Sequence, residues 1–175
     1  MFLWLIFVTA LLVSGIYLFI RNLLVVVTVE STSMSPTLLD GDRVLVLRYW
    51  PATLLQKGNI VIIWPGRITE PDDRSGPFNV TPFIKRVVAL PGEKIVTRFD
   101  ELDEFHKSKP FLRSKHDING NREWHIPPGH FFVRGDNPIG SFDSLSWGPI
   151  PDRSLLGIVV MKLSHKADPS SSSHS

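Results

Sequence analysis

The chain has 175 residues, of which 43% are hydrophobic and 21% charged, and its formal net charge at pH 7 is +2. This length allows one membrane element and one globular domain, but not two full domains. A net charge this close to zero gives no basic stripe of the kind that nucleic-acid binding needs, so we expect no nucleic-acid partner. The absence of cysteine excludes disulfides, thiolate nucleophiles and cysteine-ligated zinc sites.

The N-terminus predicts a transmembrane anchor. From Phe2 to Ile20 every residue is apolar or small except Thr9 and Ser14. At about 1.5 Å of rise per residue this run is ~28 Å long, close to the hydrocarbon thickness of a bilayer. It has no preceding basic residue and no small-x-small exit, so we expect an uncleaved anchor rather than a signal peptide. A second apolar stretch, Leu23 to Val29, extends the predicted anchor to residues 1–28.

Short β-branched and aromatic runs, separated by Pro, Gly, Asn and Asp, fill the rest of the chain. With 14 prolines and no long 3.6-residue periodicity, this pattern predicts an all-β body. The expected fold class is mainly β: one N-terminal transmembrane helix, then an antiparallel β-sheet domain with a small β-hairpin excursion or subdomain. The predicted strands are Val44–Leu47, Ile60–Trp64, Ile84–Leu90, Lys94–Val96, Trp124–Ile126, His130–Arg134 and Leu156–Leu163.

Polar segments interrupt and end this body, which we place at residues 29–165. Residues 67–80 are rich in Pro, Gly and Asp and predict a surface loop. Residues 98–125 are charged and contain Asn119-Gly120, a hairpin-turn signal, so the excursion or subdomain belongs there. Residues 166–175 are too polar to pack and predict a disordered tail.

Ser33 lies in the segment Ser33-Met34-Ser35-Pro36-Thr37-Leu38, shortly after the anchor. Taken alone this segment is also compatible with an extended turn, because proline disfavours helix at the residue before it. A serine is a poor nucleophile unless a base takes its proton, and histidine is the commonest such base. No histidine lies in a run that resembles a site, and none has the His-x-x-x-His spacing of a helical metal site, so the sequence favours neither a Ser-His-Asp triad nor a metal centre. The six histidines are His106, His116, His125, His130, His165 and His174.

Lys85 is a second candidate base, because it interrupts the apolar run from Phe83 to Leu90. Lysine in water has a pKa of about 10.4 and does not act as a base at neutral pH, but burial lowers the pKa by up to several units. Phe83, Ile84, Val87 and Val88 could supply the apolar surroundings. The alternative interpretation is that Lys85 points outward from an amphipathic strand, and the run alone leaves both open.

A third polar segment follows the strand predicted at His130–Arg134. Gly135-Asp136-Asn137 reads as a turn, and small polar residues are common in loops. Ser141 and Asp143 are two residues apart, however, so in an extended segment they face the same side. Together they can hold an ammonium group by charge and hydrogen bonds.

These segments together resemble the type I signal peptidase family, the membrane-anchored Ser/Lys endopeptidases that remove signal peptides from exported proteins. The Gly-Asp-Asn-Pro and Ser-Phe-Asp-Ser runs are also similar to the mitochondrial inner-membrane peptidase branch of that family. The resemblance covers about two thirds of the chain in the family's order. The matching segments are Ser31–Leu38, Gly41–Val46, Lys57–Val61, Lys85–Glu93 and Gly135–Pro151.

The resemblance implies a role for each residue of the site. Ser33 would be the nucleophile and Lys85 the general base, with no metal and no cofactor. The backbone N–H of Ser33 and the hydroxyl of Ser31 would form the oxyanion hole, where one donor is worth about 3 kcal/mol. Ser141 would orient the Lys85 amine, and Asp143 would support the site through Arg86.

Family members bind substrate as an added strand, with shallow pockets for small side chains at the first and third positions before the cut. The expected substrate-binding residues are Val27, Val29, Met34, Phe83 and Ile84.

Three positions depart from the family pattern. Leu145 replaces a usual arginine that pairs with the aspartate two residues earlier, Pro138 a frequent arginine, and Thr32 a common glycine. If Asp143 lacks a partner for this reason, restoring arginine at position 145 should be neutral or stabilising.

Two other functions share these features. A self-cleaving regulator of the LexA type uses the same Ser/Lys chemistry, but carries a DNA-binding domain where this chain has an apolar segment. A catalytically inactive, membrane-anchored binding module of the same fold would lack Ser33 or Lys85, and both are present.

The resemblance also implies the partners and the location. The expected partners are signal-peptide-bearing precursors, the lipid bilayer and the protein export machinery. The expected location is the plasma membrane, single-pass, with the catalytic domain on the exported side; the alternatives are the mitochondrial inner membrane and the thylakoid membrane. Arg21, just after the apolar run, weakly favours keeping that side cytoplasmic, which conflicts with the expected orientation.

Overall fold

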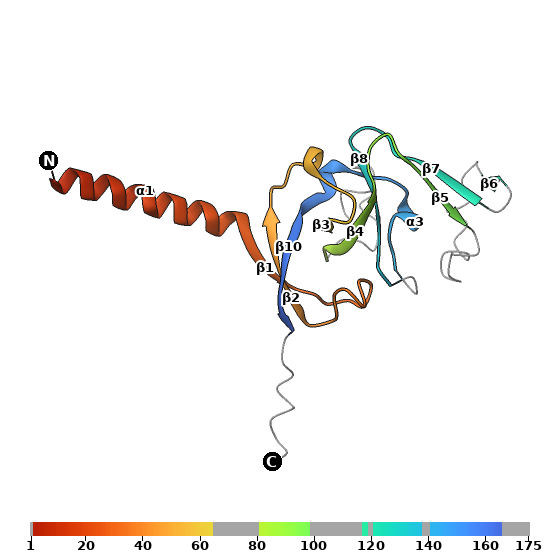
Figure 1. Cartoon of the computed structure of the whole chain (residues 1–175), viewed down its shortest axis with the longest axis horizontal. Helices are drawn as coiled ribbons and strands as arrows, with labels where there is room; N and C mark the ends of the chain where they lie inside the picture. The colour runs from red at the N-terminus through yellow and green to blue at the C-terminus, as the bar shows by residue number, and fades with distance from the viewer. Residues whose placement is uncertain (1, 65–80, 99–116, 119–120, 138–140, 166–175) are drawn as a thin grey trace, which may run out of the picture.

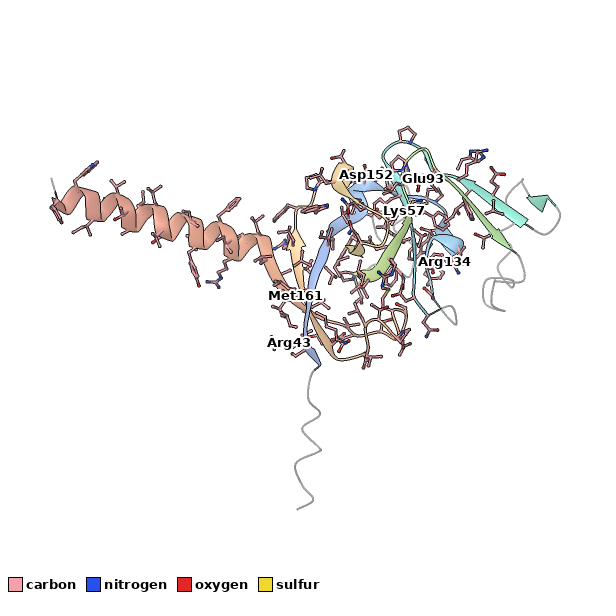
Figure 2. The ribbon with its side chains drawn as sticks, in the orientation of Figure 1. Arg43, Lys57, Glu93, Arg134, Asp152 and Met161 are labelled. Carbon is pink, nitrogen blue, oxygen red and sulfur yellow. The ribbon has the colours of Figure 1, made fainter. Side chains whose placement is uncertain are left out.

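The structure is a computed structural model that describes residues 2–64, 81–98, 117–118, 121–137 and 141–165. Helix α1 (Phe2–Leu23) projects away from a β-rich body (Figure 1). In Figure 2 the side chains drawn along most of the helix point away from the body. The window Ile6–Leu23 has a mean hydropathy of 1.8 and none of it is buried, so by length and composition it can cross a membrane.

The anchor helix is shorter than the predicted 1–28. It ends at Leu23, and the next five residues form strand β1 (Leu24–Thr28), which pairs with β2 (Asp42–Arg48). Val25, Val26 and Val27 are β-branched, so they favour a strand over a helix when a partner strand, here β2, is available. The chain therefore passes from the helix directly into the sheet.

The main sheet has seven strands in the order β1-β2-β10-β3-β4-β8-β9, and each pair is antiparallel. The expected mainly β fold with an N-terminal apolar helix is thus confirmed. The remaining strands of this sheet are β3 (Ile60–Ile63), β4 (Phe83–Ala89), β8 (His130–Arg134), β9 (Ile150–Pro151) and β10 (Leu155–His165). Short helices η1 (Ala52–Leu54), α3 (Ser144–Trp147) and η5 (Asp152–Ser154) connect some of them.

A second sheet lies at the far end of the body from α1 (Figure 1). It has three strands in the order β5-β7-β6: β5 (Lys94–Arg98), β7 (Asn121–His125) and β6 (Asp117–Ile118). A small β-sheet is thus present where the excursion was predicted, at 98–125, but its first strand begins earlier, at Lys94. The loop predicted at 67–80, the Asn119-Gly120 turn and the tail predicted at 166–175 lie outside the described residues.

Alternating side chains of the main sheet enter two apolar clusters. On β3, Val61 and Ile63 join one cluster with Val87, Phe131 and Val133, whereas Ile62 joins the other. We call the second one the groove-side cluster; its buried members are Val29, Met34, Leu38, Val44, Val46, Ile62 and Ile84. It packs the segment between β1 and β2, which carries Ser33, against the sheet and so positions that segment over β4.

Candidate active site

Ser33 lies in the loop between β1 and β2, which backbone hydrogen bonds hold at both ends. The amides of Val29 and Gly41 donate to the carbonyls of Asp42 and Val29, respectively, each at 2.8 Å. Within the loop the Ser33 amide donates to Ser31 Oγ at 3.1 Å, so the two predicted oxyanion-hole groups are neighbours.

Lys85, on β4, contacts Ser33. Its Nζ donates to Ser33 Oγ at 2.7 Å, and the residue is only 3% exposed. The ring of Phe83, two residues earlier on the same face of the strand, has its centroid 5.8 Å from Nζ. The structure therefore excludes the alternative in which Lys85 points into solvent.

Burial lowers the pKa of Lys85 from 10.5 to about 8, because the ammonium form loses its hydration. The negative charges of Asp143 and Asp136 oppose this by raising the pKa. At pH 8 about half of the Lys85 side chains are therefore neutral, compared with under 1% for a lysine in water. A neutral amine within hydrogen-bond distance of a serine hydroxyl is able to accept its proton.

Arg86 does not pair with Asp143 as predicted. Its guanidinium makes two hydrogen bonds to Asp136, from Nε to Oδ1 at 2.8 Å and from an Nη atom to Oδ2 at 2.6 Å. It also donates to the Gly58 carbonyl and to Thr37 Oγ1. These contacts raise the pKa of Arg86 and lower the pKa of Asp136. Because consecutive strand residues face opposite sides of a sheet, Arg86 cannot follow Lys85 into the same site.

Asp143 is held by uncharged donors instead. Its Oδ2 accepts from the Gly135 amide at 2.9 Å and from the Ser141 hydroxyl at 2.8 Å, and its Oδ1 accepts from the Leu145 amide at 3.0 Å. Ser141 was predicted to orient the lysine amine, but among the described residues its hydroxyl donates to Asp143 and makes no hydrogen bond to Lys85. Asp143 acts on Lys85 through its charge.

Sequence reasoning missed the residues that fix the Ser33 loop against β8. The Asn137 amide donates to the Ser33 carbonyl at 3.0 Å, and its side-chain amide donates to the Thr32 carbonyl at 3.2 Å. A Cβ atom added to Gly135 would lie 2.2 Å from Ser141 Oγ and 2.6 Å from the Ser33 carbonyl oxygen. The Gly-Asp-Asn run, interpreted as a turn and as part of a family-like segment, was the available signal, but no role was assigned to Gly135 or Asn137.

A groove of about 760 Å³ leads to Ser33 and Lys85. Four of the five residues predicted to bind substrate line it: Val27, Val29, Phe83 and Ile84. Met34 does not, because its side chain is completely buried in the groove-side cluster. The Met34 prediction is wrong for a simple reason: residue 33 faces the site, and residue 34 points into the core beneath it.

No described histidine is among the residues that line the groove with Ser33. His125 lies next to Glu123, and His130 Nδ1 is 3.1 Å from the Pro128 carbonyl. Among the described residues no group of three His, Cys, Asp or Glu side chains is placed to hold a metal ion. His106, His116 and His174 lie outside the described residues.

A family model described as signal peptidase, peptidase S26, matches residues 2–164. The chain belongs to this signal peptidase family. It is 31% identical over 148 residues to signal peptidase I V of Bacillus subtilis, covering 75% of this chain and 80% of that relative. It is also 32% identical over 140 residues to the chloroplastic thylakoidal processing peptidase 1 of Arabidopsis thaliana, covering 77% of this chain but only 40% of that longer relative.

A crystal structure of a signal peptidase I from Enterococcus faecalis V583 covers 60% of this chain and 96% of its own, at 23% identity and a TM-score of 0.38. That score is too low to support an inference about this chain. Membership of the signal peptidase family, by contrast, identifies the chain as a serine endopeptidase and removes the LexA-type alternative.

Proposed function

We propose that this signal peptidase cuts its substrates with Ser33 as the nucleophile and the neutral amine of Lys85 as the general base. The observation that carries the proposal is the 2.7 Å contact between Lys85 Nζ and Ser33 Oγ in a site where the lysine is 3% exposed. The lowered pKa of Lys85, about 8, makes the neutral amine abundant at mildly alkaline pH.

The chemistry follows from these positions. Lys85 Nζ accepts the proton of Ser33 as Oγ attacks the scissile carbonyl carbon, and the lysine becomes an ammonium. Asp143 stabilises that positive charge. The ammonium then gives the proton to the leaving amine as the peptide bond breaks. A water molecule, deprotonated by the same amine, finally hydrolyses the acyl-enzyme and restores Ser33.

The Ser33 amide and the Ser31 hydroxyl are the proposed oxyanion hole. They are hydrogen-bonded to each other, 3.1 Å apart, in this structure. When substrate binds, its carbonyl oxygen takes the place of Ser31 Oγ as the acceptor of the Ser33 amide, and the Ser31 hydroxyl rotates to donate to the same oxygen, which becomes negative in the transition state. Removing one such donor typically costs about 3 kcal/mol of transition-state stabilisation.

The groove selects an extended peptide with small side chains near the cut. β1 is the edge strand of the main sheet, so its outer backbone groups are available to an added strand. Val27, Val29 and Ile84 line the same groove as Ser33, and these branched side chains support a preference for small residues at the first and third positions before the cut. The substrates proposed are therefore precursors with a small-x-small sequence at the end of the signal peptide.

The proposed location is a membrane that α1 spans once, with the β body on the side to which proteins are exported. The helix supports the anchor, and its direct continuation into β1 supports a catalytic groove at the membrane surface. We propose that this membrane is the plasma membrane. The thylakoid membrane is the alternative, because the chain is similar to a thylakoidal processing peptidase. Protease digestion of intact vesicles tests the orientation: the β body should be cut only when the exported side is accessible.

Cleavage of a defined precursor tests the chemistry. The full chain, purified in a neutral detergent, is incubated with a precursor peptide that has one small-x-small site, and the products are identified by mass spectrometry. We expect one cut directly after the second small residue, and no cut with Ser33→Ala. Ser35→Ala, two residues away in the same loop, is the matched control and should keep the activity. Normal cleavage by Ser33→Ala would remove Ser33 as the nucleophile.

A further inference from the structure

The residues that line the groove include Val25, Arg48 and Tyr49. The register of β1 and β2 places these three at the end of the strands next to α1, which we call the far end of the groove. Among the residues that line the groove, the charged ones are Glu30, Arg48 and Lys85. Lys85 belongs to the catalytic pair, and Glu30 lies three residues before Ser33, so Arg48 is the charge that marks the far end.

The alternation of β2 explains why Arg48 faces the groove. Val44 and Val46 are buried in the groove-side cluster, and Arg48 follows them with the same two-residue period. Arg43 has the opposite parity and does not line the groove. Figure 2 shows Arg43 at the end of β2 farther from α1. The strand therefore carries two exposed arginines, one on each face of the sheet.

The side chain of Arg48 contacts the ring of Tyr49. The Arg48 Cζ lies 5.0 Å from the centroid of the Tyr49 ring, a cation–π contact. Tyr49 has a φ of +56°, a left-handed conformation that is unfavourable for a bulky residue and is often retained at functional sites. Among the described residues Arg48 has no carboxylate partner. Its charge is thus oriented but not neutralised.

The register of β1 and β2 shows which part of a substrate reaches Arg48. Leu24 pairs with Leu47 next to the helix, and Thr28 pairs with Arg43 toward Ser33. From Thr28 to Leu24 the groove wall is about 14 Å long, the length of roughly four extended residues. A signal peptide leaves the bilayer on the helix side, so the residues that precede the two small ones lie along this wall.

We propose that Arg48 is a specificity-determining residue that reads the charge of the substrate four to six positions before the cut. This rests on the proposed function, in which the groove binds the signal peptide. An acidic side chain there is attracted by the oriented guanidinium, and a lysine or arginine is repelled. The interaction forms on binding, before the chemistry, so it affects KM more than kcat.

Charge-varied peptides test the proposal on the full chain in a neutral detergent. One parent peptide carries Glu, Gln or Lys at position four, five or six before its small-x-small cut, and kcat/KM is measured for each. Wild type should prefer Glu over Lys at one of these positions by about 2- to 5-fold, the range of partly exposed ion pairs. High salt should reduce the preference. Arg48→Glu should reverse it and Arg48→Gln should abolish it, whereas Arg43→Glu should leave it as in wild type.

Each other outcome has a defined meaning. Equal kcat/KM for Glu and Lys peptides at all three positions in wild type overturns the proposal. A loss in Arg48→Gln that is the same for every peptide also overturns it, and would make Arg48 a contact to the membrane or to the fold. Failure of the proposed function looks different, because then no peptide is cut in a manner that depends on Ser33.

Discussion

Lys85 and Arg86 are adjacent on β4, and the structure treats their charges in opposite ways. Lys85 enters the site, where it is 3% exposed, contacts Ser33 Oγ and has its pKa lowered to about 8. The Arg86 side chain lies on the opposite face of the strand and is half-buried. It makes two hydrogen bonds to Asp136, which raise the pKa of Arg86. The Lys85 ammonium therefore loses its proton more readily than a lysine in water, whereas the Arg86 guanidinium stays charged.

The difference shows how one strand provides both reactivity and support. A base at neutral pH must be short of water and of close carboxylates, because both favour the ammonium form. A cation with a structural role must stay charged, so it benefits from a nearby carboxylate. The planar guanidinium can make two parallel hydrogen bonds to one carboxylate. Through Asp136 and Thr37, Arg86 connects β4 to the segments that flank Ser33.

Replacing each cation by methionine should give the sharpest contrast. Lys85→Met should reduce kcat/KM on the order of 10³-fold or more, because the base is lost. Its stability at pH 7 should be unchanged or higher by up to about 2 kcal/mol, because burying the ammonium costs about 3 kcal/mol and its hydrogen bond returns only about 1. That gain should shrink as pH rises from 8 to 10.5, where the wild-type lysine is increasingly neutral and the cost disappears.

Arg86→Met should show the reverse balance. It leaves Asp136 without its cation and should lower stability by about 1 to 3 kcal/mol, with a partial loss of activity. Thermal unfolding and peptide cleavage measure both variants. If Lys85→Met unfolded more easily than Arg86→Met at pH 7, the assignment of reactivity to one residue and support to the other would be wrong.

Gly135→Ala should have the next largest effect on activity. The added Cβ would collide with Ser141 Oγ and the Ser33 carbonyl, and displacing a catalytic group by about 1 Å can cost about 100-fold in rate. Gly129→Ala, at the other end of β8, is the matched control. Its Cβ would meet no neighbour within 4 Å, although its φ of +72° makes alanine strained there. It should therefore lower stability without a comparable loss of kcat; equal losses in both would contradict a direct effect on the site.

Leu145→Arg tests a corrected expectation. The sequence suggested that arginine here would be neutral or stabilising, as a partner for Asp143. The structure shows Asp143 with three hydrogen-bond donors and Leu145 buried among Ala89, Ile126 and Phe132. We therefore expect arginine to lower stability by about 3 kcal/mol, since it places a charge in an apolar cluster. Leu54→Arg, at an exposed leucine, should change stability by less than about 0.5 kcal/mol in the same unfolding assay.

Asp143→Asn should shift the pH dependence of cleavage, apart from any loss of stability because one amide oxygen cannot accept from all three Asp143 donors. The Asp143 carboxylate raises the pKa of Lys85, so removing its charge should lower that pKa below about 8. The rising limb of kcat/KM then moves to lower pH. Asp152→Asn, a substitution in η5 beyond β9, should leave the limb unchanged. A shift to higher pH in Asp143→Asn would show that this carboxylate does not favour the ammonium form.

Patterns within single segments carried most of the correct predictions. Apolar spacing predicted the helix and most strands, and the runs around Ser33 and Lys85 identified the two residues that the structure brings into contact across 52 positions of sequence. Val25, Val26 and Val27 were assigned to the anchor because a β-branched apolar run is ambiguous until its partner strand, β2, is known.

Side-chain partners were predicted less well, because they depend on which face of a strand or loop each residue occupies. Arg86 was paired with Asp143 by analogy, and its true partner Asp136 is set by the alternation of β4. Met34 was predicted to bind substrate, but it packs into the core. Ser141 was placed against the lysine amine, but its hydroxyl donates to the carboxylate of Asp143.

The pH dependence of cleavage is the most direct test of the Ser33/Lys85 pair. We would measure kcat/KM of the wild-type chain from pH 6 to 11 with one small-x-small peptide, since this quantity reports ionisations of the free enzyme. The account predicts a rising limb with its midpoint near 8, where Lys85 becomes neutral, and a plateau above it. A limb centred near 10.5, the value of an unperturbed lysine, or the same limb in Lys85→Met would contradict a buried lysine as the base.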